Sequence, residues 1–225
     1  RLLRVIKHRF GATDRVGMFR MTKRGIESLD DPSGLLLADR QAGVPGSAVV
    51  AVLEGHRPVL VEVQALVSPR PAGSGGFGTR TVTGLVPRRI DLILAVLAQR
   101  AQLDLSSADV FVSVAGGLTV REPAADLAIA AAVVSSATLR AVPGDVMMLG
   151  EVGLTGELRS VPEPSRRISE AARLGFSRIV APRDRSVRPA GGEVEWARSA
   201  RLQQVATLGE AMHAMSLQDA GLRAV

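Results

Sequence analysis

The chain has 225 residues, a formal net charge of +6 and 46% hydrophobic residues, so one or two domains with a real core are expected. The absence of cysteine excludes disulfides, a cysteine zinc site and a thiol nucleophile within these residues. No uncharged apolar run of about 18 residues suits a bilayer. The positive charge favours a polyanionic partner, with nucleic acid the default.

The first extended segment, residues 2–10, carries two cations at alternate positions. Period two places Lys7 and Arg9 on the same face of a strand that stops at Gly11. Two cations that point the same way at a strand end can clamp a polyanion such as a nucleotide triphosphate. The sequence has only two lysines, Lys7 and Lys23, among its 28 basic residues, which indicates a need for a compact ammonium at position 7. The alternative is a solvated edge strand with scattered charges.

The segment that follows has too few apolar residues for a core of its own. Residues 17–21 predict a strand that enters a turn at 23–25, and residues 26–33 lead to a Pro-Ser turn. We therefore expect residues 1–44 to be the β-rich tail of a larger domain. Residues 45–225 have a different character and predict a second unit.

Residues 45–225 alternate strand and helix signals, which predicts an α/β (α+β) domain. Two apolar strands predict a hairpin, and a loop rich in Gly, Pro and Ser follows it. The predicted strands are residues 47–53, 59–67, 110–114, 147–149, 157–161, 178–181 and 203–205. The predicted helices are residues 87–100, 123–137, 165–173 and 208–215. Small residues all round the 123–137 helix predict packing on more than one face, and Asp126 within it is expected to cap the helix or pair with an arginine.

A series of motifs follows the chain in order. They are Lys7-His8-Arg9-Phe10-Gly11, residues 17–21, 54–58, 61–67, 109–117, 122–128 and 150–154. Together they resemble the bacterial RadA (Sms) family of DNA-repair ATPases, whose Lys-Asn-Arg-Phe-Gly signature corresponds to residues 7–11. The departures are His8 in place of Asn and Arg20 in place of an acid.

The resemblance implies that residues 1–44 end a RecA-like ATPase core. It implies that residues 45–225 form a Lon-protease-like domain of ribosomal protein S5 domain 2-like fold. The family is a DNA-dependent ATPase, a cytoplasmic, nucleoid-associated hexameric ring that drives branch migration in homologous recombination. Its partners would be single-stranded and branched or duplex DNA and the RecA recombinase. Lys7 and Arg9 would contact ATP on a neighbouring protomer, within the intersubunit motif that His8, Phe10 and Gly11 complete.

Cofactors are expected elsewhere in the whole protein. The resemblance implies ATP and magnesium in the full-length protein and zinc in an N-terminal finger that these residues lack. The Gly-rich residues 73–78 do not end in the Gly-Lys-Ser/Thr of a phosphate loop. His8, His56 and His213 lack the spacing of metal ligands. We therefore expect this chain alone to bind no cofactor or metal.

The Lon resemblance raises a second hypothesis, a Ser–Lys peptidase. By that resemblance Ala124 stands at the nucleophile position, and Arg166 stands near the position of the Lys base. Alanine carries no nucleophile, and an arginine stays protonated. Both halves of the dyad are missing, so we expect no peptide hydrolysis.

Arginines gather in groups that suit phosphate contacts, which position DNA without reading its sequence. We expect DNA contacts from Arg80, Arg88, Arg89, Arg166 and Arg167. The alternative is solvated faces or salt bridges to the 22 acids. A third hypothesis for the chain is a purely structural oligomerisation module with no role on DNA.

Overall fold

The computed structural model describes residues 2–4, 16–29, 31–70, 76–184, 187 and 195–215. The predicted clamp motif at residues 7–11 lies outside the described residues, so its geometry stays a prediction. Within the described ranges, no helix is long and apolar enough to cross a membrane.

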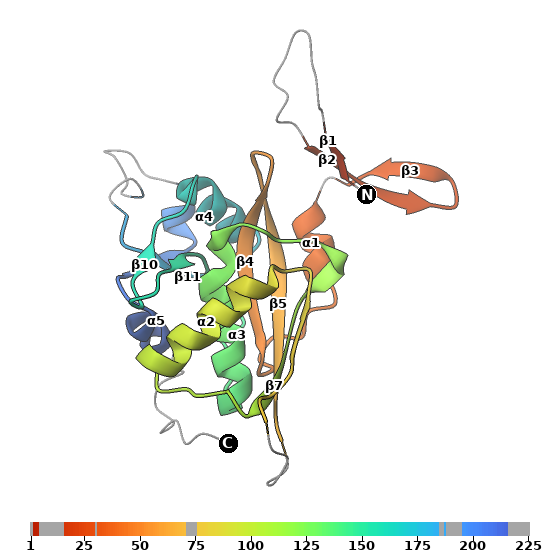
Figure 1. Cartoon of the computed structure of the whole chain (residues 1–225). Helices are drawn as coiled ribbons and strands as arrows, with labels where there is room; N and C mark the ends of the chain where they lie inside the picture. The colour runs from red at the N-terminus through yellow and green to blue at the C-terminus, as the bar shows by residue number, and fades with distance from the viewer. Residues whose placement is uncertain are drawn as a thin grey trace.

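A seven-stranded mixed sheet organises most of the chain (Figure 1), which confirms the predicted mixed α/β class. Its strand order is β12-β11-β8-β4-β5-β7-β6. The strands are β4 (Ser47–Glu54), β5 (Arg57–Pro69), β6 (Arg80–Thr83), β7 (Ala108–Val114), β8 (Val146–Met148), β11 (Arg178–Pro182) and β12 (Arg201–Val205). β5 runs antiparallel to both β4 and β7, and the other neighbouring strands are parallel.

The central pair β4 and β5 is the predicted hairpin. Its register runs from Ser47 opposite Gln64 to Glu54 opposite Arg57, with a two-residue turn between the strands. Gly55 in that turn has a φ of 65°, which glycine adopts without a steric penalty. β4 is buried over most of its length and β5 over residues 59–63, where the sequences of both strands are mostly apolar.

The predicted helices are present with small shifts at their ends. They are α2 (Pro87–Arg100), α3 (Asp126–Thr138), α4 (Pro164–Arg173) and α5 (Leu208–Ala214). Proline opens α2 and α4, where its missing N–H costs no helical hydrogen bond. The strand β6 was not predicted, because its four residues follow directly on a Gly-rich segment.

Helix α3 is enclosed by its own chain. Every residue from Asp126 to Ser136 is buried, and the helix packs against β4, β5 and α2. The Ser135 hydroxyl accepts from the Gly46 N–H at 2.9 Å, and that of Ser136 accepts from the Val67 N–H at 2.9 Å. The prediction of several packed faces is confirmed, but those faces meet this chain and leave none for a second copy.

The residues before β4 contribute a short helix that was predicted as a turn. In α1 (Pro32–Leu37), the carboxylate of Asp31 accepts from the Gly34 N–H at 3.1 Å and caps the first turn. The buried hydroxyl of Ser33 donates to Glu170 at 3.0 Å and accepts from the Leu60 N–H at 3.1 Å. These bonds tie α1 to α4 and β5.

A small antiparallel sheet precedes α1. It consists of β1 (Leu2–Arg4), β2 (Val16–Thr22) and β3 (Gly25–Ser28), and it stands apart from the main sheet at the top of Figure 1. The hairpin of β2 and β3 matches the strand and turn predicted there. The division into residues 1–44 and 45–225 stays a prediction.

Candidate functional site

The position predicted for a peptidase nucleophile lies in a tight turn before α3. Ala124 belongs to the 3-10 turn η2 (Pro123–Ala125) and is 1% exposed. Its carbonyl accepts from the Gly150 N–H at 3.0 Å, which fixes the turn. The buried methyl group offers no reactive atom, so the nucleophile is absent here in structure as well as in sequence.

The arginine that faces this turn is Arg167, and its neighbour Arg166 points to solvent. Arg167 is fully buried, and its Nη1 and Nη2 donate to the two carboxylate oxygens of Glu122 at 2.9 and 2.7 Å. Further donations go to the carbonyls of Ala51 at 2.6 Å and Pro162 at 2.9 Å. The proposed place of Arg166 near the base position stays a prediction, and Arg167 is the residue of the two that contacts Glu122 beside the turn.

Glu122 completes this tie between separate elements. Besides Arg167, it accepts from the Leu53 N–H at 2.7 Å, at the end of β4. One carboxylate therefore joins β4, the turn before α3 and helix α4. An arginine stays protonated, and this one makes four hydrogen bonds, so it holds structure together and cannot act as a base.

Three of the five arginines predicted to touch DNA are buried or half-buried and are held by partners within the fold. Arg167 is buried as described, and Arg80 donates to the carbonyls of Leu105 and Ala108 at 2.9 and 2.7 Å. Arg89 forms a two-pronged ion pair with Asp126, whose Nε–Oδ1 distance is 2.6 Å. The expected pairing of Asp126 is confirmed. Arg88 and Arg166 are the two that remain exposed.

The Asp126 carboxylate is strongly influenced by its surroundings. Burial raises its pKa, while the Arg89 guanidinium and the Val152 N–H, at 3.0 Å, act in the opposite direction. The pair joins the start of α2 to the start of α3. Arg89 therefore has a structural task that a phosphate would disrupt.

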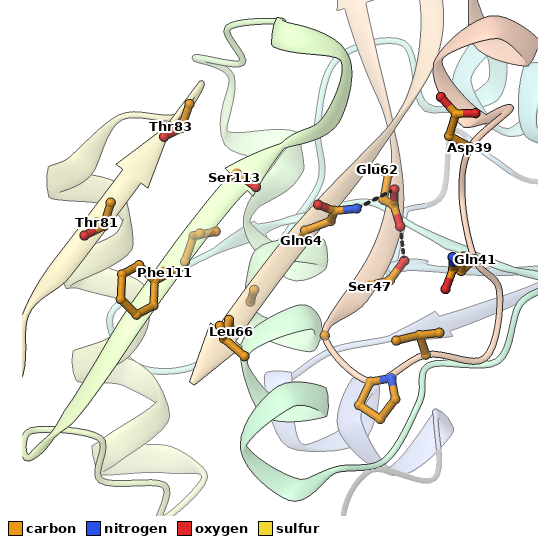
Figure 2. Close-up of a pocket in the computed structure, with 15 residues that line it drawn as sticks. Asp39, Gln41, Ser47, Glu62, Gln64, Leu66, Thr81, Thr83, Phe111 and Ser113 are labelled. Atoms are coloured by element: carbon orange, nitrogen blue, oxygen red, sulfur yellow. Dashed lines mark hydrogen bonds between the residues drawn. The ribbon is translucent and has the colours of Figure 1, made fainter. Parts of the chain in front are cut away.

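A groove of about 550 Å³ lies on one face of the sheet, between β4, β5, β7 and β6 (Figure 2). Alternate residues of β5, namely Glu62, Gln64 and Leu66, line it. The period of two along a strand places these three side chains on one face of the sheet. Sequence analysis missed this surface, although a polar, polar, apolar alternation within an otherwise buried strand is a usable signal.

The groove combines a polar end with an apolar end. Glu62 is only 4% exposed and accepts from the Ser47 hydroxyl at 2.5 Å and from Gln64 Nε2 at 3.0 Å. Leu66 and Phe111 lie side by side, because they are paired in register across β5 and β7. They are 60% and 39% exposed and form a small apolar patch at this end of the groove.

Among the described residues, no group of three His, Asp or Glu side chains is arranged to hold a metal ion. His56 instead lies 2.7 Å from Glu163 at the start of α4. The Glu163 pKa is lowered, chiefly by that hydrogen bond.

Known proteins match nearly the whole chain. Residues 88–185 match the family described as subunit ChlI of Mg-chelatase. "DNA repair protein RadA" of Halalkalibacterium halodurans is 46% identical over 81% of this chain and 39% of its own length. The RadA of Mycolicibacterium smegmatis is 46% identical over 86% and 41%, and that of Listeria monocytogenes 41% over 94% and 45%. The chain thus spans about two fifths of the length of these curated relatives.

Removing the buried guanidinium of Arg167 should lower the free energy of unfolding strongly, whereas removing the exposed one of Arg166 should lower it little. Arg167→Leu leaves the partly buried Glu122 with only the Leu53 N–H and deprives the Ala51 and Pro162 carbonyls of their donor, so we expect a loss of about 3 kcal/mol in the free energy of unfolding. Arg166→Leu removes only an exposed charge and should cost less than about 1 kcal/mol. Urea denaturation followed by circular dichroism measures both. Equal stabilities for the two variants would contradict the structural role of Arg167.

Proposed function

The chain belongs to the family of the RadA proteins, which match 81–94% of its residues. We propose that it is the C-terminal part of a DNA-dependent repair ATPase. That motor would drive branch migration in homologous recombination together with a RecA recombinase. The observation that carries the proposal is the 40–46% identity over 81–94% of the chain. ATP and magnesium would bind in a RecA-like core of the whole protein, and zinc in an N-terminal finger.

Within this motor, residues 45–225 would be a Lon-protease-like domain of ribosomal protein S5 domain 2-like fold that has lost peptidase chemistry. The buried Ala124 and the tie between Arg167 and Glu122 support this role. A Ser–Lys peptidase is the alternative. Purified protein in a casein assay should show no turnover above buffer, and turnover that a substitution in this domain abolishes would favour the peptidase.

Residues 7–11 would supply the link between the ring and its nucleotide. Lys7 and Arg9 would reach the phosphates of ATP bound to the neighbouring protomer, and His8, Phe10 and Gly11 would complete the motif. The support for this role is the alternation of the two cations and the resemblance of the motif. A hexameric ring in the cytoplasm, on the nucleoid, is the assembly that we propose.

Two surfaces of the described residues suit the roles of DNA binding and assembly. Arg88 and Arg166 are exposed and can reach phosphates without giving up a buried partner. The sheet face with Leu66 and Phe111 (Figure 2) is the surface that we propose for packing between copies, since α3 is already enclosed.

We predict salt-sensitive, sequence-independent DNA binding through the exposed arginines. If Arg88 and Arg166 each touch one phosphate, the double change to Glu should flatten the slope of log K against log salt by about 2. The loss should be equal for unrelated sequences, because phosphates carry no base identity. Fluorescence anisotropy with labelled duplex and single-stranded DNA measures it.

The DNA experiment needs a control that keeps the fold. Arg159→Glu changes an exposed arginine whose partner is Glu157, and it should leave the slope nearly unchanged. Arg89 is left intact, since its loss would strand the buried Asp126. Unchanged affinity in the Arg88, Arg166 double variant would move the DNA surface elsewhere.

We also predict that the domain self-associates through the open sheet face. Phe111→Ser combined with Leu66→Ser should shift the association to higher protein concentration, because it removes the exposed apolar pair. Phe77→Ser is the matched control, since Phe77 is 87% exposed and lies outside the groove. Light scattering over a concentration series measures the mass. A strict monomer of the unaltered chain at high micromolar concentration would contradict the prediction.

A further inference from the structure

A second pocket, of about 490 Å³, lies where α4 meets the 3-10 turn η4 (Glu195–Arg198). Its polar lining consists of Ser165, Arg166, Ser169, Glu170, Arg173, Trp196 and Ser199. The first five of these residues lie on one face of α4, because positions three and four apart on a helix are neighbours. Trp196 comes from η4.

This pocket is rich in hydrogen-bond donors that have no acceptor. The Ser165 and Ser169 side chains are exposed, and the structure records no bond from them to another described residue. Arg166 engages only Nη1, with Glu163 and the His56 carbonyl. Arg173 uses Nε and Nη2 and leaves Nη1 unused among the described contacts.

Trp196 adds a donor that is both buried and unpaired. The residue is 6% exposed, and its Nε1 has no hydrogen-bond partner in the described part of the chain. A buried donor without an acceptor is unfavourable. A small shift of the ring toward an oxygen in the pocket would therefore lower the free energy.

The carboxylates in and beside the pocket, Glu170 and Glu163, already accept hydrogen bonds from other side chains. Glu170 accepts from Ser33 and from Arg173 at 2.9–3.0 Å, and its pKa is lowered, chiefly by the Arg173 bond. Glu163 accepts from His56 and Arg166. The unused hydrogen-bonding groups of the site are thus mainly donors, and they include Nε and Nη2 of Arg166 and Nη1 of Arg173. That chemistry matches an oxyanion with several acceptor oxygens.

We propose that this pocket binds phosphate oxygens of a nucleic-acid backbone. The choice of DNA as the source of the phosphate rests on the proposed function, whereas the phosphate chemistry itself rests on the donor set. Arg166 would rotate from Glu163 to the ligand, which costs little because that ion pair is exposed. Ser165, Ser169 and Arg173 Nη1 would hold the remaining oxygens.

The chain carries its own reporter for this site. Trp196 is its single tryptophan, so intrinsic fluorescence excited at the indole band reports on the pocket alone. Inorganic phosphate, ATP and an oligothymidylate are titrated separately into the full chain at low salt. We expect a saturable change in Trp196 fluorescence, with the oligonucleotide saturating at the lowest phosphate concentration. If ATP saturates at a lower phosphate concentration than the oligonucleotide, the pocket still binds phosphate oxygens, and its ligand is a free nucleotide.

Variants decide whether the response belongs to the pocket. Ser169→Ala combined with Arg166→Gln should raise the half-saturating concentration at least 10-fold, and both residues are exposed, so the fold is kept. Arg159→Gln, outside the pocket, should change nothing. Absence of a saturable response to all three ligands would overturn the proposal, as would an equal response in the double variant.

The readouts separate this proposal from the proposed function. Labelled DNA that binds the chain while Trp196 fluorescence stays constant would overturn the pocket and leave the DNA role intact. A response to phosphate in a chain that binds no DNA would support the pocket and count against the DNA role.

Discussion

The ion pair between Glu122 and Arg167 is the interaction on which the rest of the domain depends. It joins the end of β4, the turn before α3 and helix α4, three elements that are far apart in sequence. The Arg167 guanidinium is fully buried and the carboxylate of its partner Glu122 is only partly exposed, so removing either charge alone should lower the stability. In the Lon-like domain that we propose, this tie would lie beside the position of the peptidase nucleophile, which Ala124 occupies here.

The arginines singled out in the sequence fall into two groups, those that hold elements of the fold together and those that are exposed. Arg167 and Arg89 are ion-paired to Glu122 and Asp126, and Arg80 is bound to backbone carbonyls, so these three hold elements together. Arg88 and Arg166 remain exposed at the starts of α2 and α4. A basic composition therefore says less about DNA binding than it first suggests, since burial decides which charges can meet a phosphate. The open sheet face and the α4 pocket extend the surfaces available for partners.

Local patterns predicted much of the fold. The β4–β5 hairpin and helices α2, α3 and α4 followed from apolar periodicity and from proline at helix starts, which act over a few residues. Helix α1 was missed, because its stability comes from Ser33 binding Glu170 and Leu60, contacts that sequence spacing does not reveal. The burial of Arg167 was not predicted, for a similar reason. Adjacent helix residues differ by about 100° in direction, so a shift of one residue exchanges a buried side chain for an exposed one.

We propose that this chain works within an ATP-driven DNA machine, and changes at Lys7 are the sharpest experiment on that proposal. DNA-stimulated ATP hydrolysis by the full-length protein is measured for Lys7→Ala, Lys7→Arg and the control Lys23→Arg, which changes the only other lysine of the chain. We expect a loss of about 10³-fold for Lys7→Ala, impairment for Lys7→Arg and normal turnover for Lys23→Arg. Unaltered DNA-stimulated turnover in Lys7→Ala would overturn the role of residues 7–11 in ATP hydrolysis.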